Sequence, residues 1–413
     1  MNINVAIGWI SKFIVLALSL INTRLLIESI GTNGLAAYSI ILSLSAWIGL
    51  LNLGLPITAQ NSISKLRGRN RNHQRSRNEY YGAMIIISIF LSPVVILMAI
   101  IAKFYILSDY SYVSGLSLIF SCLFIYINSQ SQLMNQVLYA ENMAFWPNFY
   151  PALMAIYTTM ALILAVKFQV NNVNYILILL TMANIIMPIH SAIKLKLFKN
   201  AEYSFKKIIK NIYSARGQLL FAFLSNCVLA MDYIIMSQNL SAEDIVEYNL
   251  TSRIYGILLI INNVIIATNW TPMSDLLHGL KLNEAKLQLE KILKQGLLLG
   301  GLVGLLIIIF MNSLTSIWTG GKVSSIPLIL GISLWLYALI RIWTDTFSMA
   351  LLGYGMAGKI NAFIVVQAVI SIVLQIFLGN YFGSSGVVLG QVISFLLTVS
   401  WILPKIFYKI VRM

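Results

Sequence analysis

The sequence is poor in charge. Only 10% of its 413 residues are Asp, Glu, Lys or Arg, whereas 59% are hydrophobic. Ordinary soluble domains carry about 25% charged residues. A soluble core could not bury this much apolar surface, so lipid must solvate much of it. The composition therefore predicts an all-α membrane protein, because a helix satisfies its own backbone hydrogen bonds inside a bilayer.

Residues that ligate metals or perform catalysis are also scarce. Cys122 and Cys227 both lie in apolar segments and form no disulfide or metal pattern. The three histidines are scattered along the chain, at His73, His190 and His278. Gly320-Gly321-Lys322 is followed by Val323, so it is not a phosphate-binding loop. We expect no enzyme activity, no metal and no cofactor, and a gradient, a membrane potential or a partner as the source of energy.

Hydropathy divides the chain into twelve expected membrane spans of about 20 residues or more. They cover residues 5–28, 35–59, 82–107, 113–138, 144–166, 173–197, 217–239, 247–270, 296–318, 326–351, 360–379 and 384–407. The connecting loops are short, which disfavours a glycosyltransferase or ligase that needs a large external loop or catalytic acids.

The basic residues are distributed unequally between the two sides of the membrane. The net charge is +15, which in a soluble protein would suggest nucleic acid. Here 21 basic residues fall in loops on one side, including six in 61–80, and three on the other. Cytoplasmic loops carry the excess of Lys and Arg, so both termini are expected in the cytoplasm.

A shift of 212 residues superimposes the hydropathy and charge patterns of the two halves. It lays the basic loop 61–80 on residues 273–292, which form another basic loop. This predicts two six-helix lobes, 1–200 and 201–413, as a parallel 6+6 pseudo-repeat around a central cavity. Such repeats place a substrate site at their interface. Within the second lobe, Gly296, Gly300 and Gly304 form a strip suited to close helix packing.

Charges inside the expected spans are the most informative residues. A charge at mid-bilayer costs about 2.5–3.5 kcal/mol on insertion scales, so it must face a cavity, find a partner or reach the interface. Six residues qualify: Lys12, Arg24, Asp232, Arg253, Arg341 and Asp345. Four cations against two anions favour a multivalent anion such as a diphosphate, which arginine can bind bidentately.

Each of these charges has a structural alternative. Lys12 either faces a cavity or has a partner elsewhere in the fold, and Arg24 either binds substrate or extends to the outer interface.

Asp232 and Arg253 have similar expected depths on consecutive helices. They either form an ion pair, or Arg253 meets an anion while Asp232 tunes it or carries a coupling proton. Arg341 and Asp345 are four residues apart, so they share a helix face and are expected to pair locally.

A stretch near the N-terminus resembles the O-antigen flippase group of the polysaccharide transporter family. This family belongs to the superfamily that includes multidrug and toxin extruders and the lipid II flippase. The resemblance lies in Asn22–Leu26, Gly34–Leu44 and Trp47–Leu55: an arginine ends the first helix, and a Leu-rich segment closes on an L-G-L-like turn. Asn52 stands where the family often has aspartate. Arg24 and Arg253 resemble cavity arginines of the lipid II flippase branch, but the second span has no basic residue.

The resemblance implies export of an undecaprenyl-diphosphate-linked oligosaccharide across a bacterial inner membrane, as in O-antigen and lipopolysaccharide biosynthesis. It implies antiport with H⁺ or Na⁺, and a polysaccharide polymerase and chain-length protein as partners beside the membrane lipids. Two alternatives stay open. A multidrug exporter of the same fold would favour organic cations. A major-facilitator sugar transporter usually carries an aspartate motif in its 2–3 loop, whereas residues 61–80 contain none.

Overall fold

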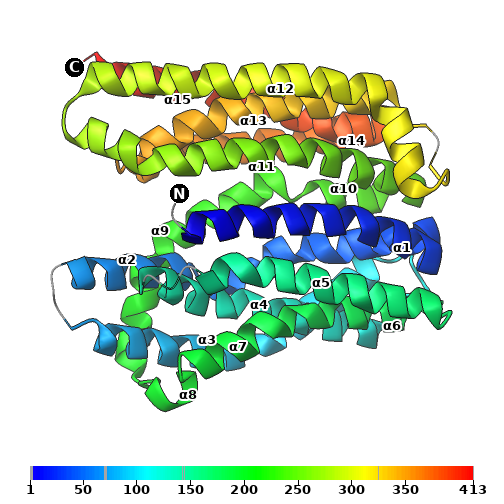
Figure 1. Cartoon of the computed structure of the whole chain (residues 1–413), viewed down its shortest axis with the longest axis horizontal. Coiled ribbons are helices and arrows are strands. Elements are labelled where there is room, and N and C mark those ends of the chain that lie inside the picture. The colour runs from blue at the N-terminus through cyan, green and yellow to red at the C-terminus, as the bar shows by residue number, and fades with distance from the viewer. Residues whose placement is uncertain (1–2, 69–71, 142, 144, 324, 413) are drawn as a thin grey trace. The chain divides into compact units, whose positions relative to one another are not determined.

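The computed structural model describes residues 3–68, 72–141, 143, 145–323 and 325–412, and this part of the chain is helical with no β-strand. The chain divides into two compact units, Met1–Phe223 and Leu224–Met413. We describe each unit by itself (Figure 1).

The helices of the N-terminal unit centre on α4. Its elements are α1 (Ile3–Gly49), η1 (Leu50–Asn52), α2 (Leu55–Gly68), α3 (Gln74–Ile101), η2 (Ala102–Ile106), α4 (Gly115–Ala140), α5 (Phe145–Lys167), α6 (Val173–Thr181), η3 (Met182–Ile185), α7 (Ile186–Lys194), α8 (Leu197–Asn200) and most of α9 (Phe205–Leu229). Helix α4 packs against α1, α2, α3, α6 and α7, and α1 also packs along α5.

The helices of the C-terminal unit centre on α13. Its elements after α9 are α10 (Asp232–Asn239), α11 (Ala242–His278), α12 (Leu282–Thr319), α13 (Leu328–Gly353), α14 (Ala357–Leu397) and α15 (Val399–Val411). Helix α13 packs against α11, α12, α14 and α15.

Two helical stretches are each long enough to cross a bilayer twice. Among the described residues, nine helical stretches are long and apolar enough to span, and two of these, Ile10–Asn52 and Gly358–Val411, have 43 and 54 residues. Both contain a glycine with positive φ, Gly31 at 72° and Gly383 at 59°, a conformation that side chains with a Cβ rarely adopt. Each glycine therefore turns the chain between two spans. When each of these two long stretches is counted as two spans and α11, which has 37 residues, is added, the helices agree with about twelve spans.

The second expected span, 35–59, ends earlier than hydropathy indicates. The helix gives way to a turn at Leu53 and Gly54, with φ of 54° and 70°, and the chain restarts as α2. The Asn52 side-chain oxygen accepts a hydrogen bond from the Gly54 amide at 2.9 Å. This Asx turn competes with continuation of the helix. The position at which the family often has aspartate thus has a local structural role that asparagine also fulfils.

The internal repeat is visible in the helix boundaries. A shift of 212 residues carries α4 onto residues 327–352, whereas α13 runs from Leu328 to Gly353. The same shift carries Phe145, where α5 begins, onto Ala357, where α14 begins. The central helix of each unit therefore occupies the same place in the repeat, as expected for two parallel sets of six spans.

The glycine strip of α12 packs against α13, as its spacing predicts. A Cβ added to Gly300 would lie 2.7 Å from the Ile342 side chain, and one added to Gly304 would lie 2.2 Å from the Trp335 ring. The Trp335 indole also donates a hydrogen bond to the Gly300 carbonyl at 3.1 Å. The helices are therefore close enough for backbone and side chain to bond directly.

Replacing Gly304 by valine is expected to destabilise the C-terminal unit by about 1–3 kcal/mol, because an added side chain would displace the Trp335 ring. The measurement is the apparent melting temperature of the purified protein in detergent. Gly301→Val is the matched control, since a Cβ there meets nothing within 4 Å. Equal melting temperatures for both variants would show that this contact does not support the fold.

Candidate functional site

Asp232 is a buried carboxylate at the first residue of α10. The span expected over 217–239 is interrupted at Ala230 and Met231, so α10 begins inside this expected span rather than in a loop. One carboxylate oxygen accepts the Tyr233 amide at 2.9 Å, and the other accepts the Tyr248 hydroxyl. Asp232 is only 6% exposed and forms no ion pair with any residue that the structure describes. Hydrogen bonds from Tyr233 and Tyr248 therefore stabilise its charge.

Two tyrosines and an asparagine surround this carboxylate. The rings of Tyr233 and Tyr248 meet edge to face, with centroids 5.3 Å apart. The Asn249 amide donates to the Tyr233 hydroxyl at 2.7 Å. Arg253, one turn further along α11, interacts electrostatically with that same hydroxyl. Tyr233 is thus connected to both Asp232 and Arg253.

Arg341 and Asp345 form the local pair on α13 that their spacing predicts. The arginine Nη2 lies 2.9 Å from Asp345 Oδ2, and Nε lies 3.2 Å from Oδ1, so the contact is bidentate. Arg341 Nη1 also donates to the Tyr337 hydroxyl at 3.0 Å. The two charged side chains are 19% and 28% exposed. The pair is therefore mostly buried, with its charges mutually compensated.

These groups form one connected set within the C-terminal unit. Tyr337 lies within electrostatic range of Asp232 as well as of Arg341 and Asp345. We call the set the C-unit polar cluster: Asp232, Tyr233, Tyr248, Asn249, Arg253, Tyr337, Arg341 and Asp345. It brings together four of the six charges singled out in the sequence, from α10, α11 and α13. Its hydroxyls, amide and guanidinium groups can donate hydrogen bonds to an anion, and Asp232 can accept a proton or a monovalent cation.

A double substitution separates a structural role of Arg341 from substrate binding. Arg341→Ala alone leaves Asp345 without its cation inside the unit, which costs about 3–5 kcal/mol for a buried pair. Arg341→Ala with Asp345→Ala removes both charges. We expect the free energy of unfolding of this double variant, followed by its melting temperature, to lie within about 1–2 kcal/mol of that of the parent protein. Transport by this double variant measures the remaining role of Arg341. Wild-type transport would limit Arg341 to stabilising the helix.

The other two predicted charges lie on α1 in the N-terminal unit. Lys12 and Arg24 are both exposed. They are twelve residues apart, so about 18 Å of helix separates them, and they are about a third of a turn apart around the axis. Arg24 Nε lies 3.1 Å from Glu28 Oε1, an exposed pair at the i,i+4 spacing. Glu28 offsets the charge of Arg24, so the excess positive charge within the spans is smaller than the six residues alone indicate.

Helix α4 also carries buried amide side chains, which are polar but uncharged. The Asn128 amide donates to the Asn184 oxygen at 2.9 Å, and Gln130 donates to the Leu51 carbonyl at 2.9 Å. Within the described residues, the side-chain oxygens of Asn128 and Asn135 are buried and have no hydrogen-bond partner. Amides repeated inside an apolar span are a readable signal, because each needs partners in a bilayer.

The tyrosines of the C-unit polar cluster were also missed. Tyr337, Arg341 and Asp345 follow at four-residue intervals, so one helix face carries all three. This spacing was available in the sequence. The contact between Tyr248 and Asp232 was not, because it depends on how α10 packs beside α11. No group of three or more His, Cys, Asp or Glu that could hold a metal ion occurs among the described residues.

Known proteins resemble this chain over its whole length, although no protein-family model matches it. A putative O-antigen transporter of Salmonella typhi is 27% identical over 99% of this chain and 96% of its own length. A putative O-antigen export protein of Yersinia pseudotuberculosis is 27% identical over 97% of this chain and 94% of its own. The resemblance to O-antigen flippases indicated by the N-terminal stretch is confirmed and extends to the full chain.

Solved structures show the fold. The lipid II flippase MurJ in an inward closed conformation has a TM-score of 0.72 at 17% identity, covering 98% of this chain and 90% of that one. An inward-facing multidrug resistance MATE family transporter of the MOP superfamily has a TM-score of 0.74 at 14% identity, covering 97% and 95%. The chain is therefore an all-α, multi-pass membrane protein with about twelve spans, as its composition and hydropathy predict.

Proposed function

We propose that this membrane protein is a flippase for an undecaprenyl-diphosphate-linked oligosaccharide, a repeat unit of O-antigen or a similar surface polysaccharide. The observation that carries the proposal is the full-length similarity to proteins named as O-antigen transporters or export proteins. The shared fold with a lipid II flippase supports it, since that protein is named for a lipid-linked substrate. On this proposal the chain is a transporter and not an enzyme. It lies in a bacterial inner membrane with both termini in the cytoplasm.

In the proposed mechanism, cationic side chains bind the diphosphate during ion-coupled alternating access. Arg253 and Arg341 are the candidates in the C-unit polar cluster, and Lys12 and Arg24 are those on α1. Arg341 is held by Asp345 at 2.9 Å and Arg24 by Glu28 at 3.1 Å, so a phosphate would share each of these guanidinium groups with a carboxylate. Asp232 is the candidate for coupling to H⁺ or Na⁺, and Asp345 acts in charge pairing.

The experiment that tests this function is deletion of the gene in its source bacterium. We expect loss of surface polysaccharide and accumulation of the lipid-linked unit in the cytoplasmic leaflet, both restored by the wild-type gene. Because MATE transporters share the fold, the same strains are tested for sensitivity to cationic drugs. Drug sensitivity with normal surface polysaccharide would replace the proposal by multidrug export. A partner polymerase or chain-length protein would be sought by co-purification from the complemented strain.

A further inference from the structure

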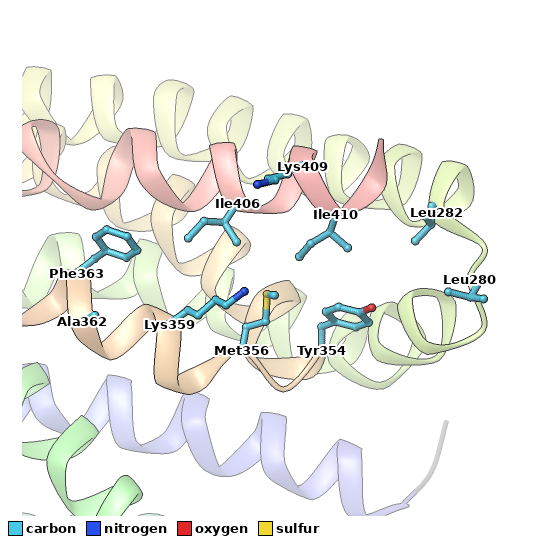
Figure 2. Close-up of a pocket in the computed structure, with 10 residues that line it drawn as sticks. All are labelled: Leu280, Leu282, Tyr354, Met356, Lys359, Ala362, Phe363, Ile406, Lys409 and Ile410. Atoms are coloured by element: carbon cyan, nitrogen blue, oxygen red, sulfur yellow. The ribbon is translucent and has the colours of Figure 1, made fainter. Parts of the chain in front are cut away.

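A groove of about 880 Å³ lies at one end of the C-terminal unit. It is formed where the α11–α12 connection, the start of α14 and the end of α15 approach one another. Figure 2 shows Lys359 extending from α14 toward α15, which carries Lys409. Its volume is within the range of about 300–1,000 Å³ that is typical of small-molecule sites.

The lining of the groove is amphipathic. Apolar side chains of Ala362, Phe363 and Ile406 line it together with Lys359 and Lys409. Both lysines are exposed, and neither is paired with a carboxylate among the residues that the structure describes. The nearby ion pairs instead join Lys281 to Glu284 and Lys286 to Glu290. The groove therefore combines an apolar lining with two exposed ammonium groups.

The surrounding segments are strongly basic. Residues 275–294, 354–359 and 405–413 together contain eight Lys or Arg and three Asp or Glu. The positive-inside rule places this end of the unit on the cytoplasmic side, beside a leaflet that carries anionic lipids. Leu280, at the rim, is 74% exposed, as expected of a side chain that contacts lipid at the interface.

We propose that this groove binds one anionic phospholipid of the bilayer. Its phosphate would lie between Lys359 and Lys409, and an acyl chain would lie along Ala362, Phe363 and Ile406. Basic pockets between membrane helices on the cytoplasmic side bind such headgroups because two cations offset the charge of the phosphate while the apolar wall excludes water. This resident lipid is distinct from the transported one, so the proposal goes beyond flipping and does not depend on it.

The test is an equilibrium titration of the purified, detergent-solubilised protein with a fluorescent phosphatidylglycerol, read by anisotropy. Lys359→Gln with Lys409→Gln is expected to weaken binding roughly 25-fold, since each basic residue near an anionic headgroup contributes about fivefold. Lys291→Gln with Lys294→Gln is the matched control, because these exposed lysines belong to the same basic end but do not line the groove. Ala362→Trp keeps the charges, fills the apolar wall and is also expected to weaken binding.

Competition by unlabelled compounds identifies the occupant. Phosphatidylglycerol should displace the probe, whereas phosphatidylcholine and inorganic phosphate should not. Equal losses in the groove variant and the control variant would show diffuse attraction to a basic surface and overturn the proposal. Stronger displacement by undecaprenyl diphosphate than by phosphatidylglycerol would assign the groove to the transported lipid instead, which also overturns it. Melting temperatures of all variants exclude misfolding as the cause of a loss.

Discussion

Replacing Arg253 by alanine is expected to reduce surface polysaccharide by at least about tenfold, because hydrogen bonds to charged groups contribute about 1.5–3 kcal/mol each. The residue lies on α11 and interacts electrostatically with the hydroxyl of Tyr233, which belongs to the C-unit polar cluster. A guanidinium in this setting can present two parallel donors to a phosphate. The measurement is complementation of the deletion strain, with membrane insertion checked by immunoblotting.

Two further variants separate geometry from charge at this position. Arg253→Lys keeps the charge but loses the planar fork, so we expect partial activity between that of alanine and wild type. Lys291→Ala removes an exposed cation far from the C-unit polar cluster in the sequence and should leave polysaccharide unchanged. Full activity of an Arg253→Ala protein that inserts normally would remove this residue from the mechanism.

Replacing Asp232 by asparagine is expected to abolish the response of transport to an ion gradient. Asparagine is similar in shape and its oxygen can still accept the Tyr248 hydroxyl, but it can neither take up a proton nor offer a charge to Na⁺. The measurement is flipping by proteoliposomes with an imposed pH or Na⁺ gradient. We expect no stimulation by either gradient in this variant and a clear stimulation of the wild type by one of them.

Asp345→Asn is the matched control for this experiment. The Asp345 carboxylate is bound by the guanidinium of Arg341, whereas in the described part of the chain the Asp232 carboxylate is bound by neutral donors, the Tyr233 amide and the Tyr248 hydroxyl. The asparagine variant at 345 should therefore retain stimulation by the gradient, even if its stability falls. If the Asp232→Asn protein is still stimulated by the gradient, Asp232 is not the coupling residue. If stimulation is lost in the Asp345→Asn protein alone, coupling is assigned to Asp345.

The architecture was predictable because its main determinants are local. About 20 apolar residues specify a span wherever they occur, so windows of that length give a number of crossings with which the helices agree. The glycine strip of α12 and the pairing of Arg341 with Asp345 follow from helical periodicity, which requires no knowledge of other helices. These are the features that agree in detail with the structure.

Breaks within helices were harder to predict. Hydropathy averages over a window, so it does not detect the turn at Leu53 and Gly54 or the interruption before Asp232. Both depend on side-chain hydrogen bonds to the backbone: Asn52 to the Gly54 amide, and Asp232 to the Tyr233 amide. A span boundary read from apolarity alone therefore misses such sites, one of which begins the C-unit polar cluster.

The contacts within the cluster could not be read from spacing, because they join different helices. The cost of a charge in a bilayer singled out Asp232 and Arg253, and their role in a site stays a prediction. That argument identifies the residues but not their partners, and the carboxylate in fact bonds to Tyr248. Tyrosine carries no charge and is frequent in this sequence, so neither composition nor hydropathy distinguishes the tyrosines that line the site.

The most direct test of the central claim uses purified protein in vesicles that contain an undecaprenyl-diphosphate-linked oligosaccharide. The headgroup is exposed to a membrane-impermeant modifying reagent, which reports how much of it reaches the opposite leaflet. We predict that wild-type protein makes the whole pool accessible and that Arg253→Ala protein leaves about half of it protected, as in empty vesicles. Protection in wild-type vesicles equal to that in empty vesicles, with the protein folded and a gradient of either ion imposed, would contradict the account.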